Sequence, residues 1–316
     1  MLAGIGGREV MRFEERPDPV PGSDELLLAA THAALNTADL AQRAGAYPAP
    51  PGAPADIPGL EVAGTVIARG AAVRGIQEGD RVFGLVGGGG LADRVVVHER
   101  HVAFVPDRLS DEQSAAVPEA FITAHDAMVT QGGLGLGDVL LVNGANGGVG
   151  TAAVQIGVAT GARVFACVRS GDARKRVAEL GAEPVGPDDF VERVRGEGGA
   201  DVVLELVGAP NLDADLDALA PKGRIAVVGT GAGDVGELAL RKLMGKRARL
   251  IGTVLRARPV EEKAAAVQAF AHALVPLLAA GRLAPVVDRV FPAEDAPDAF
   301  DHMAQPGKFG KVLLAF

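Results

Sequence analysis

The chain has 316 residues, enough for two domains with cores of their own, and its 48% hydrophobic and 22% charged residues are typical of a globular protein. A net charge of −9 without a basic stripe argues against nucleic acid as a ligand, and no long apolar segment indicates a signal peptide or a membrane span. The only cysteine, Cys167, excludes an intrachain disulfide and a cysteine-rich zinc site, so we expect a cytoplasmic protein with no membrane partner.

The first third of the chain is predicted to form short strands between turns rich in proline and glycine. The expected strands are residues 25–30, 61–68, 80–85 and 93–98. This spacing indicates an antiparallel, partly barrel-like region. A short helix at residues 111–117 is expected to follow it.

From about Glu119 onward, strands and helices alternate, which is typical of a parallel, doubly wound α/β sheet. The expected strands are residues 139–142, 163–168, 183–185, 201–207, 224–228 and 249–255. Most of the segments between them have the pattern of helices. The sequence therefore predicts a sheet of about six parallel strands.

Pro259 is expected to open a long helix that ends at Gly281. Its apolar side is predicted to carry Val260, Ala264, Val267, Phe270, Leu274 and Leu277. The tail is predicted as a strand, a helix at 296–303 and a last strand at 311–316. Because the tail is more similar to the first region than to the middle, we expect domains at 1–118 and 119–280, with 281–316 returning to the first domain.

A glycine-rich turn follows the first strand of the parallel sheet. The pattern G-x-G-x-x-G of dinucleotide-binding turns falls on Ala145, Gly147 and Gly150, with alanine at its first position. Strand, turn and helix follow in the order that a pyrophosphate needs, with backbone N–H groups at the start of the helix. We predict that residues Ala145, Asn146, Gly147, Gly148, Val149 and Gly150 bind the cofactor; the alternative is a plain glycine turn.

The end of the next strand indicates which dinucleotide is bound. In folds that bind NAD, an acidic residue about twenty residues past the turn holds the ribose 2′-hydroxyl. Here the strand ends in Arg169 and Ser170, with Arg174 close behind, and these side chains suit a 2′-phosphate. We therefore predict NADPH as the cofactor, unless Arg169 is only a solvated residue.

The chain resembles the quinone oxidoreductase group of medium-chain dehydrogenases/reductases, the members of which lack zinc, over nearly its whole length. The motifs that carry the resemblance are residues 34–40, 57–64, 78–84, 143–150, 180–182 and 309–312. Within the group it is most similar to the stress-inducible branch known in mammals. This closer likeness uses residues 42–47, 50–52, 87–90, 117–120 and 255–258.

The resemblance implies a GroES-like substrate domain, a Rossmann domain, NADPH and an active cleft between the domains. It also implies a homodimer, often built through the last Rossmann strand. No bound metal is expected, because Asn36 stands where zinc-dependent relatives have their first ligand. Those relatives also have a His-Glu pair, and here Leu60 precedes Glu61 instead of a histidine.

The resemblance also assigns residues to the site. Asn36 is expected to orient the substrate oxygen, although capping of a helix would explain it equally well. Tyr47, the only tyrosine, is expected to hydrogen-bond the developing oxyanion, with packing as the alternative. The residues expected near the cofactor are Thr123, at a helix start, and Gly229, Leu255, Arg256 and Lys311.

These expectations predict an NADPH-dependent reductase that passes a hydride, or electrons, to a quinone without a metal. Such an enzyme needs an acceptor that takes hydride readily, because no Lewis acid activates the substrate. One alternative is reduction of the conjugated C=C bond of an enone, enal or enoyl thioester. Another is a non-catalytic NADPH-binding sensor or partner protein.

Overall fold

The computed structural model describes residues 1–316, which divide into two compact units. Unit 1 comprises residues 1–122 and 255–316, and unit 2 comprises residues 123–254. Our expected boundaries were 118 and 281. The return to unit 1 comes earlier because the long helix α9 (Val260–Ala279) packs on strand β6 (Val102–Phe104) and on the 3₁₀ turn Glu99–His101 of the same unit.

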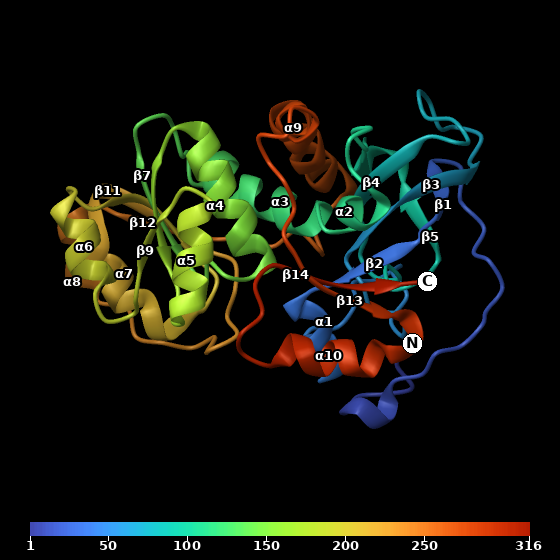
Figure 1. The fold of residues 1–316 in the computed structure, drawn as a ribbon, viewed down its shortest axis with the longest axis horizontal. Coiled ribbons are helices and arrows are strands. Elements are labelled where there is room, and N and C mark those ends of the chain that lie inside the picture. Colours follow the sequence, from blue (N-terminus) through green and yellow to red (C-terminus); the bar gives the residue numbers. More distant parts are fainter. The chain divides into compact units, whose positions relative to one another are not determined.

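Unit 1 contains two sheets. A five-stranded antiparallel sheet has the order β5-β1-β3-β4-β6, and a three-stranded sheet has the order β13-β14-β2 (Figure 1). The strand bounds are β1 Glu25–Ala29, β2 His32–Leu35, β3 Glu61–Arg69, β4 Arg81–Leu85, β5 Arg94–His98, β13 Val287–Pro292 and β14 Lys311–Ala315. Its helices are α1 Thr37–Arg43, α2 Asp111–Ala115 and α10 Ala296–Ala304, besides α9.

Alternation of buried and half-buried side chains is clearest in β5. In β5, Val95 and Val97 are buried in the core of the five-stranded sheet, while their neighbours are half-buried. The last strand, β14, pairs antiparallel with β2 and joins the carboxyl end of the chain to unit 1, as expected. This pairing sets Val312 opposite Leu35, and so brings Lys311 beside the residues that follow β2.

Helix α9 buries one side, as its pattern predicts, with two differences. Ala264, Val267, Phe270 and Leu274 are buried, and Phe270 packs on Phe83 with ring centroids 5.7 Å apart. Val260 in the first turn is exposed, and Leu278 rather than Leu277 completes the buried stripe. Near the ends of a helix the buried side is set by the neighbouring segments rather than by the period alone.

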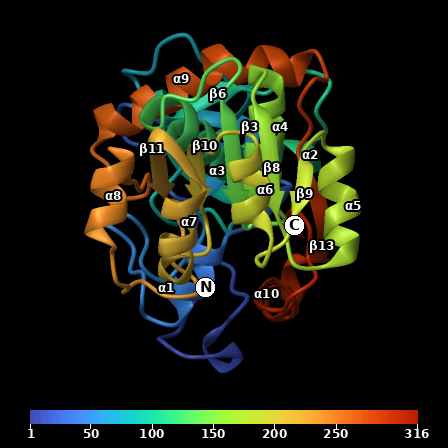
Figure 2. The same ribbon diagram turned by 90° about the vertical axis from the view of Figure 1, so that its left-hand side faces the viewer.

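Unit 2 is a six-stranded parallel sheet with the order β12-β11-β10-β7-β8-β9. Helices α4 and α5 lie on one side of the strands and α6, α7 and α8 on the other (Figures 1 and 2). The strands are β7 Val139–Asn143, β8 Arg163–Cys167, β9 Glu183–Val185, β10 Ala200–Glu205, β11 Leu219–Val227 and β12 Arg249–Gly252. The helices are α4 Gly148–Thr160, α5 Gly171–Glu179, α6 Phe190–Gly196, α7 Leu212–Ala218 and α8 Leu240–Lys246.

The doubly wound α/β sheet and the separate, mainly β unit confirm the predicted fold class. Both faces of the parallel sheet are covered, which explains why β7 and β10 are runs of buried apolar residues. Helix α4 can approach the sheet closely because Gly157 has no side chain; a Cβ atom there would lie 2.6 Å from a methyl group of Leu140. None of the helices combines the length and the apolar composition needed to cross a bilayer.

Helix α3 (Pro118–His125) corrects one local expectation. Thr123 was expected to begin a helix, but the helix begins at Pro118, a residue suited to a first helical position. Thr123 therefore lies inside the helix, buried, at the first residue of unit 2.

Candidate functional site

A buried polar network surrounds Asn36, the residue between β2 and α1. The Asn36 Nδ2 atom donates to Glu61 Oε1 at 2.7 Å, and Lys311 Nζ donates to Asn36 Oδ1 at 2.6 Å. Lys311 Nζ also donates to Glu61 Oε1 at 2.7 Å and to the Leu35 carbonyl at 3.0 Å. Asn36, Glu61 and Lys311 are 9%, 1% and 4% exposed, so the side-chain amide is fixed by a buried ion pair.

Two further carboxylate contacts fix the backbone around this network. Asp39, in the first turn of α1, accepts from the Asn36 and Gly59 N–H groups, each at 2.8 Å. Burial raises the pKa of Asp39 to about 6. The second oxygen of Glu61 accepts from the Glu119 N–H at 2.8 Å, which ties the start of α3 to the start of β3.

Asn36 is the N-cap residue of α1, and its side chain also belongs to the polar network. Its N–H is capped by Asp39 at the start of α1, and its side-chain amide keeps one N–H that the protein does not use. Lys311, expected near the cofactor, has its three ammonium protons directed at three acceptors of unit 1. It therefore acts on Asn36 and Glu61 in this structure.

Tyr47 follows the other end of α1. Its N–H donates to the Ala41 carbonyl at 3.2 Å, which folds the chain back at the end of the helix. The phenol is half-buried and its hydroxyl makes no hydrogen bond with the protein, while burial raises its pKa. Asn36 and Tyr47 are therefore carried by the two ends of one short helix.

Arg256 was expected near the cofactor, and in the structure its guanidinium contacts residues of unit 1. The side chain is 6% exposed and lies over the Tyr47 ring, with its carbon 5.0 Å from the ring centroid. All its hydrogen bonds go to residues of unit 1. The neighbouring Leu255 is buried, at 5% exposed.

The glycine-rich turn between β7 and α4 has the geometry of a phosphate cradle. Gly144 has φ 76°, and the turn closes through the Gly147 N–H and the Gly144 carbonyl at 3.2 Å. A Cβ atom at Gly150 would strike the Gly144 carbonyl and come within 2.6 Å of Ala145 Cα, whereas one at Gly147 would enter nearly open space. The helix therefore packs tightly behind the turn, and the front of the turn is open to a ligand.

The other residues of this turn take complementary places. Ala145, the departure from the glycine pattern, is fully buried, and its N–H donates to the Cys167 carbonyl at 3.3 Å. Asn146, Gly148 and Val149 are half-buried, and Gly148 and Val149 belong to the first turn of α4. Their N–H groups precede the first carbonyl-bonded turn of the helix, which suits a pyrophosphate.

Arg169 and Ser170 lie exposed after β8, where the sequence predicts the 2′-phosphate site. The Ser170 hydroxyl accepts from the Ala173 N–H at 3.1 Å and so caps α5. The guanidinium groups of Arg169 and of the half-buried Arg174 make no hydrogen bond or ion pair with the protein. Both guanidinium groups are thus available to an anion.

Gly229, expected near the cofactor, lies just beyond β11. Its N–H donates to the Glu205 carbonyl at 3.1 Å, and a Cβ atom there would strike the Leu206 carbonyl. Close packing of two strand ends therefore requires a glycine at this position.

A second buried polar cluster, not anticipated as such from the sequence, lies in unit 2. Asn143 Nδ2, at the last residue of β7, donates to both Glu205 Oε2 and Asp215 Oδ1 at 2.7 Å. Glu205 also accepts from the N–H groups of Val207 and Gly208, which shapes the loop after β10. Burial and the nearby Glu205 carboxylate raise the pKa of Asp215, so this pair holds a proton.

The polar residues around Asn36 do not suit a zinc ion. Zinc needs at least three protein ligands drawn from Cys, His and carboxylates, but Glu61 is the one carboxylate bonded to the Asn36 side chain, and it is already bonded to the Lys311 ammonium. Nowhere in the structure do three side chains of the types His, Cys, Asp and Glu come together as metal ligands.

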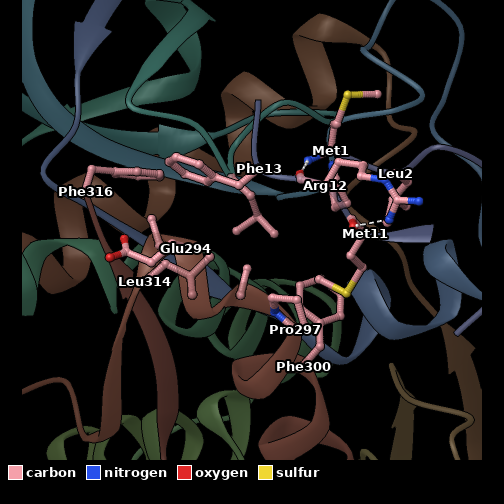
Figure 3. A pocket seen from close by; sticks show the side chains of 14 residues that line it. Met1, Leu2, Met11, Arg12, Phe13, Glu294, Pro297, Phe300, Leu314 and Phe316 are labelled. Atoms are coloured by element: carbon pink, nitrogen blue, oxygen red, sulfur yellow. Dashed lines mark hydrogen bonds between the residues drawn. The ribbon is translucent and has the colours of Figure 1, made fainter. Parts of the chain in front are cut away.

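Unit 1 also has a pocket of about 260 Å³, lined by side chains of the N-terminal segment, α10 and β14 (Figure 3). Phe13, Phe300 and Leu314 are among its apolar side chains, and Arg12 and Glu294 also line it. None of the predicted site residues contributes to this pocket.

Comparison with known proteins places this geometry in a family. Residues 22–107 match the model of the alcohol dehydrogenase GroES-like domain, and residues 148–272 match that of the zinc-binding dehydrogenases. A quinone oxidoreductase of Sus scrofa is 32% identical over 319 residues, which cover 98% of this chain and 95% of that protein. The chain belongs to the quinone oxidoreductase group of the medium-chain dehydrogenases/reductases. It is therefore an oxidoreductase with the nicotinamide-dinucleotide fold of this family.

Solved structures of this family superpose along the whole chain. A quinone oxidoreductase of Pseudomonas syringae pv. tomato matches with a TM-score of 0.88 and 26% identity, covering 100% of this chain and 98% of that one. A mycobacterial protein complexed with NADPH matches with a TM-score of 0.88 and 28% identity, over 100% and 98% of the two chains. An NAD-dependent alcohol dehydrogenase matches with a TM-score of 0.86 and 31% identity, over 99% and 98%.

The chain is also similar to an enoyl reductase and to a polyketide synthase protein. The CurK enoyl reductase matches with a TM-score of 0.85 and 25% identity, over 99% of this chain and 97% of that one. The spectinabilin polyketide synthase protein NorB of Streptomyces orinoci is 37% identical over 265 residues, which cover 81% of this chain and 12% of that protein.

Proposed function

We propose that this protein is an NADPH-dependent quinone oxidoreductase that acts without a metal. The observation that carries the proposal is the pair of unused donors at the ends of α1. These are one side-chain N–H of Asn36, which the Glu61–Lys311 ion pair fixes, and the hydroxyl of Tyr47. The likeness to a pig quinone oxidoreductase over almost the full chain supports a quinone as the acceptor.

In this proposal the two donors bind a carbonyl oxygen of the acceptor, whose negative charge grows during reduction. When bound, the nicotinamide supplies a hydride. Asn36 keeps its orientation because Lys311 and Glu61 hold its amide from both sides, and it needs no reorganisation as charge develops. Solvent supplies the proton that completes the hydroquinone, since a quinone oxyanion is a weak base.

The preference for NADPH over NADH is part of the same proposal. Arg169 and Arg174 lie after β8 without a partner, and no carboxylate holds the position that NAD-binding folds reserve for the ribose 2′-hydroxyl. The nearby Asp172 side chain is 95% exposed and lies 3.9 Å from Lys175. A 2′-phosphate would gain charge-assisted hydrogen bonds from the two arginines.

Reduction of a conjugated C=C bond is a second candidate. The likeness to the CurK enoyl reductase and to NorB favours it, and the same two donors would bind the carbonyl oxygen of an enone or enoyl thioester. The two functions differ in the acceptor and share the site.

A steady-state comparison of acceptors tests the proposal. Initial rates are measured with NADPH and with NADH, on 1,4-quinones, 9,10-phenanthrenequinone and alkenals. We expect NADPH-dependent reduction of the quinones, and a loss of about tenfold or more in kcat/KM for Tyr47→Phe because one oxyanion donor is removed. Turnover of alkenals alone would favour the second candidate, and NADPH binding without any turnover would favour a sensor.

The choice of cofactor is tested separately by binding. Arg169→Ala is expected to weaken NADPH binding by about tenfold and to leave NADH binding unchanged, because one charge-assisted contact is lost. Calorimetry on the wild type and the variant measures both affinities. Equal affinity of the wild type for the two dinucleotides would contradict the proposed preference.

A homodimer is also part of the proposal. Strand β12 is the edge of the unit 2 sheet, with Arg249 exposed and Leu250 40% exposed. An exposed edge strand can continue the sheet into a second copy of the chain. Light scattering coupled to size-exclusion chromatography, on the wild type and on Leu250→Lys, measures whether this edge forms the dimer.

A further inference from the structure

Arg256 makes an unusual set of contacts for a buried cation. Its Nε donates to the Gly87 carbonyl at 2.8 Å and its Nη1 to the Tyr47 carbonyl at 3.0 Å, while Nη2 donates to Gln42 Oε1. One guanidinium thus joins the Tyr47 segment, the Gly87 segment and helix α1. Each acceptor is a neutral oxygen, so no carboxylate is hydrogen-bonded to the buried guanidinium.

A second buried cation holds Arg256 in place. Lys263, in the first turn of α9, is 6% exposed and donates its Nζ to the Arg256 carbonyl at 2.9 Å. Burying two cations without a hydrogen-bonded carboxylate on either costs stability. Such a cost is expected at functional sites, where local rules of stability are broken for a purpose.

The contacts of Arg256 converge on one side chain, Tyr47. The guanidinium holds the Tyr47 backbone through the carbonyl and covers the face of its ring, with the carbon 5.0 Å from the centroid. The hydroxyl remains outside these contacts. A residue with backbone and ring both fixed presents its hydroxyl in one direction only.

We propose that Arg256 is a positioning residue that orients the Tyr47 hydroxyl toward the acceptor oxygen by joining the Tyr47 and Gly87 segments. The inference rests on the proposed function only in assigning that oxygen to a quinone or enone. Arg256 touches no reacting atom in this role and acts through Tyr47.

The composition of the chain allows a direct test that needs neither cofactor nor acceptor. Tyr47 is the only tyrosine and the chain has no tryptophan, so tyrosine fluorescence reports this side chain alone. Acrylamide quenching and anisotropy of that emission are measured in the wild type, Arg256→Met and Arg256→Lys. We expect at least a twofold rise in the quenching constant and a lower anisotropy for Arg256→Met. Arg256→Lys should be intermediate, because lysine keeps the charge but cannot bond three separated acceptors.

Arg289→Met is the matched control. Arg289 is exposed and stacks on Phe291 of the same unit at 4.6 Å from the ring centroid, without bonding either segment that Arg256 joins. We expect its Tyr47 emission to equal that of the wild type. If Arg256→Met and Arg256→Lys also leave the emission unchanged, Arg256 does not hold Tyr47 and the inference is overturned.

A double-mutant cycle then tests the catalytic part. If Arg256 acts through Tyr47, Arg256→Lys should lower kcat/KM about tenfold in the wild type but less than twofold in the Tyr47→Phe background. Equal losses in both backgrounds would show an independent structural role and overturn the inference. If Tyr47→Phe keeps full activity, while the Arg256 variants change the Tyr47 emission as expected, then Tyr47 is not the donor. That result refutes the assigned role of Tyr47 and the catalytic inference with it, but leaves the cofactor assignment intact.

Discussion

Removal of the Lys311 ammonium is expected to destabilise unit 1 strongly. Lys311→Met keeps the length and the apolar stem of the side chain but deletes three hydrogen bonds, to Leu35, Asn36 and Glu61. Glu61, which is 1% exposed, would keep its charge and lose its only cation. Breaking one side of a buried ion pair costs about 3–5 kcal/mol of unfolding free energy.

Neutralising the other side should recover much of this loss. In Glu61→Gln/Lys311→Met neither member of the ion pair is charged. The single carbonyl oxygen of the amide at position 61 can accept from the Asn36 side chain or from the Glu119 N–H, because these two donors bond different oxygens of Glu61. The remaining cost is that of unsatisfied neutral polar groups, about 1–3 kcal/mol. The double variant is therefore expected to be more stable than Lys311→Met alone.

Urea unfolding followed by tyrosine fluorescence measures these free energies, because the emission comes from Tyr47 in unit 1. The coupling energy is the sum of the two single losses minus the loss of the double variant, and we expect about 2 kcal/mol or more. Additive losses would show that the two charges do not depend on each other and would refute the reasoning.

Three further predictions concern other parts of the chain. Gly147→Ala should fold normally but bind NADPH at least about tenfold more weakly, because its Cβ atom would enter the open front of the turn. Gly150→Ala should also lose stability, since its Cβ atom would strike Gly144 and Ala145. Calorimetry measures the binding and thermal unfolding measures the stability of both variants. Equal behaviour of the two variants would contradict the cradle geometry. Burial lowers the pKa of His101 to about 4, so the unfolded chain binds this proton first and unit 1 should lose about 2–3 kcal/mol as pH falls from about 6.5 to about 4. Urea unfolding of His101→Gln should show a smaller loss, and an unchanged pH slope would contradict the assignment. The raised pKa of Asp215 means that folding favours its protonated form and that this contribution fades as pH rises. Asp215→Asn should therefore stabilise unit 2 at neutral pH by about 1–3 kcal/mol in circular-dichroism unfolding, and a loss of stability would show that the carboxylate is the favoured form.

The parts of the fold that the sequence reveals are those that local pattern controls. The nucleotide turn lies within one short stretch, in which a buried strand, its glycines and helix α4 follow directly. The alternating burial of β5 and the apolar runs of the parallel strands are also local. Strands β2 and β6 escape prediction because they are short, and small residues such as Ala33 and Ala34 give β2 no clear period.

The polar network escapes prediction because its partners are far apart in the chain. Asn36 is 25 positions from Glu61, and Lys311 is 250 positions from the same carboxylate. Lys311 opens a strand that is otherwise apolar, and that is the one signal in the sequence for its burial. Nothing local distinguishes Asp215 from a solvated acid of a helix, since its burial comes from the packing of α7 on the sheet.

Arg256 shows that a predicted position along the chain does not determine the contacts of a side chain. A resemblance in sequence fixes where a residue lies along the last strand and the loop after it, but it does not fix the side-chain direction. The guanidinium donates to three acceptors of unit 1, and Lys263 bonds the backbone carbonyl of Arg256. The direction is thus decided by tertiary contacts that no local period encodes.

The two ends of α1 are fixed by different means, and this difference separates stability from activity. Asn36 is held by a charged pair in the core, so disturbing it should cost folding free energy first. Tyr47 is held by one guanidinium through a carbonyl and a ring face, contacts that contribute less to stability but fix the direction of its hydroxyl. Changes at Lys311 should therefore lower mainly the free energy of unfolding, with a smaller effect on kcat/KM of the folded enzyme. Changes at Arg256 should lower mainly kcat/KM, with a smaller effect on the free energy of unfolding. The order follows from the partners of each cation. Removing Lys311 leaves the Glu61 carboxylate buried without its bonded cation, whereas Arg256 is hydrogen-bonded only to neutral acceptors and can be retained for what it positions.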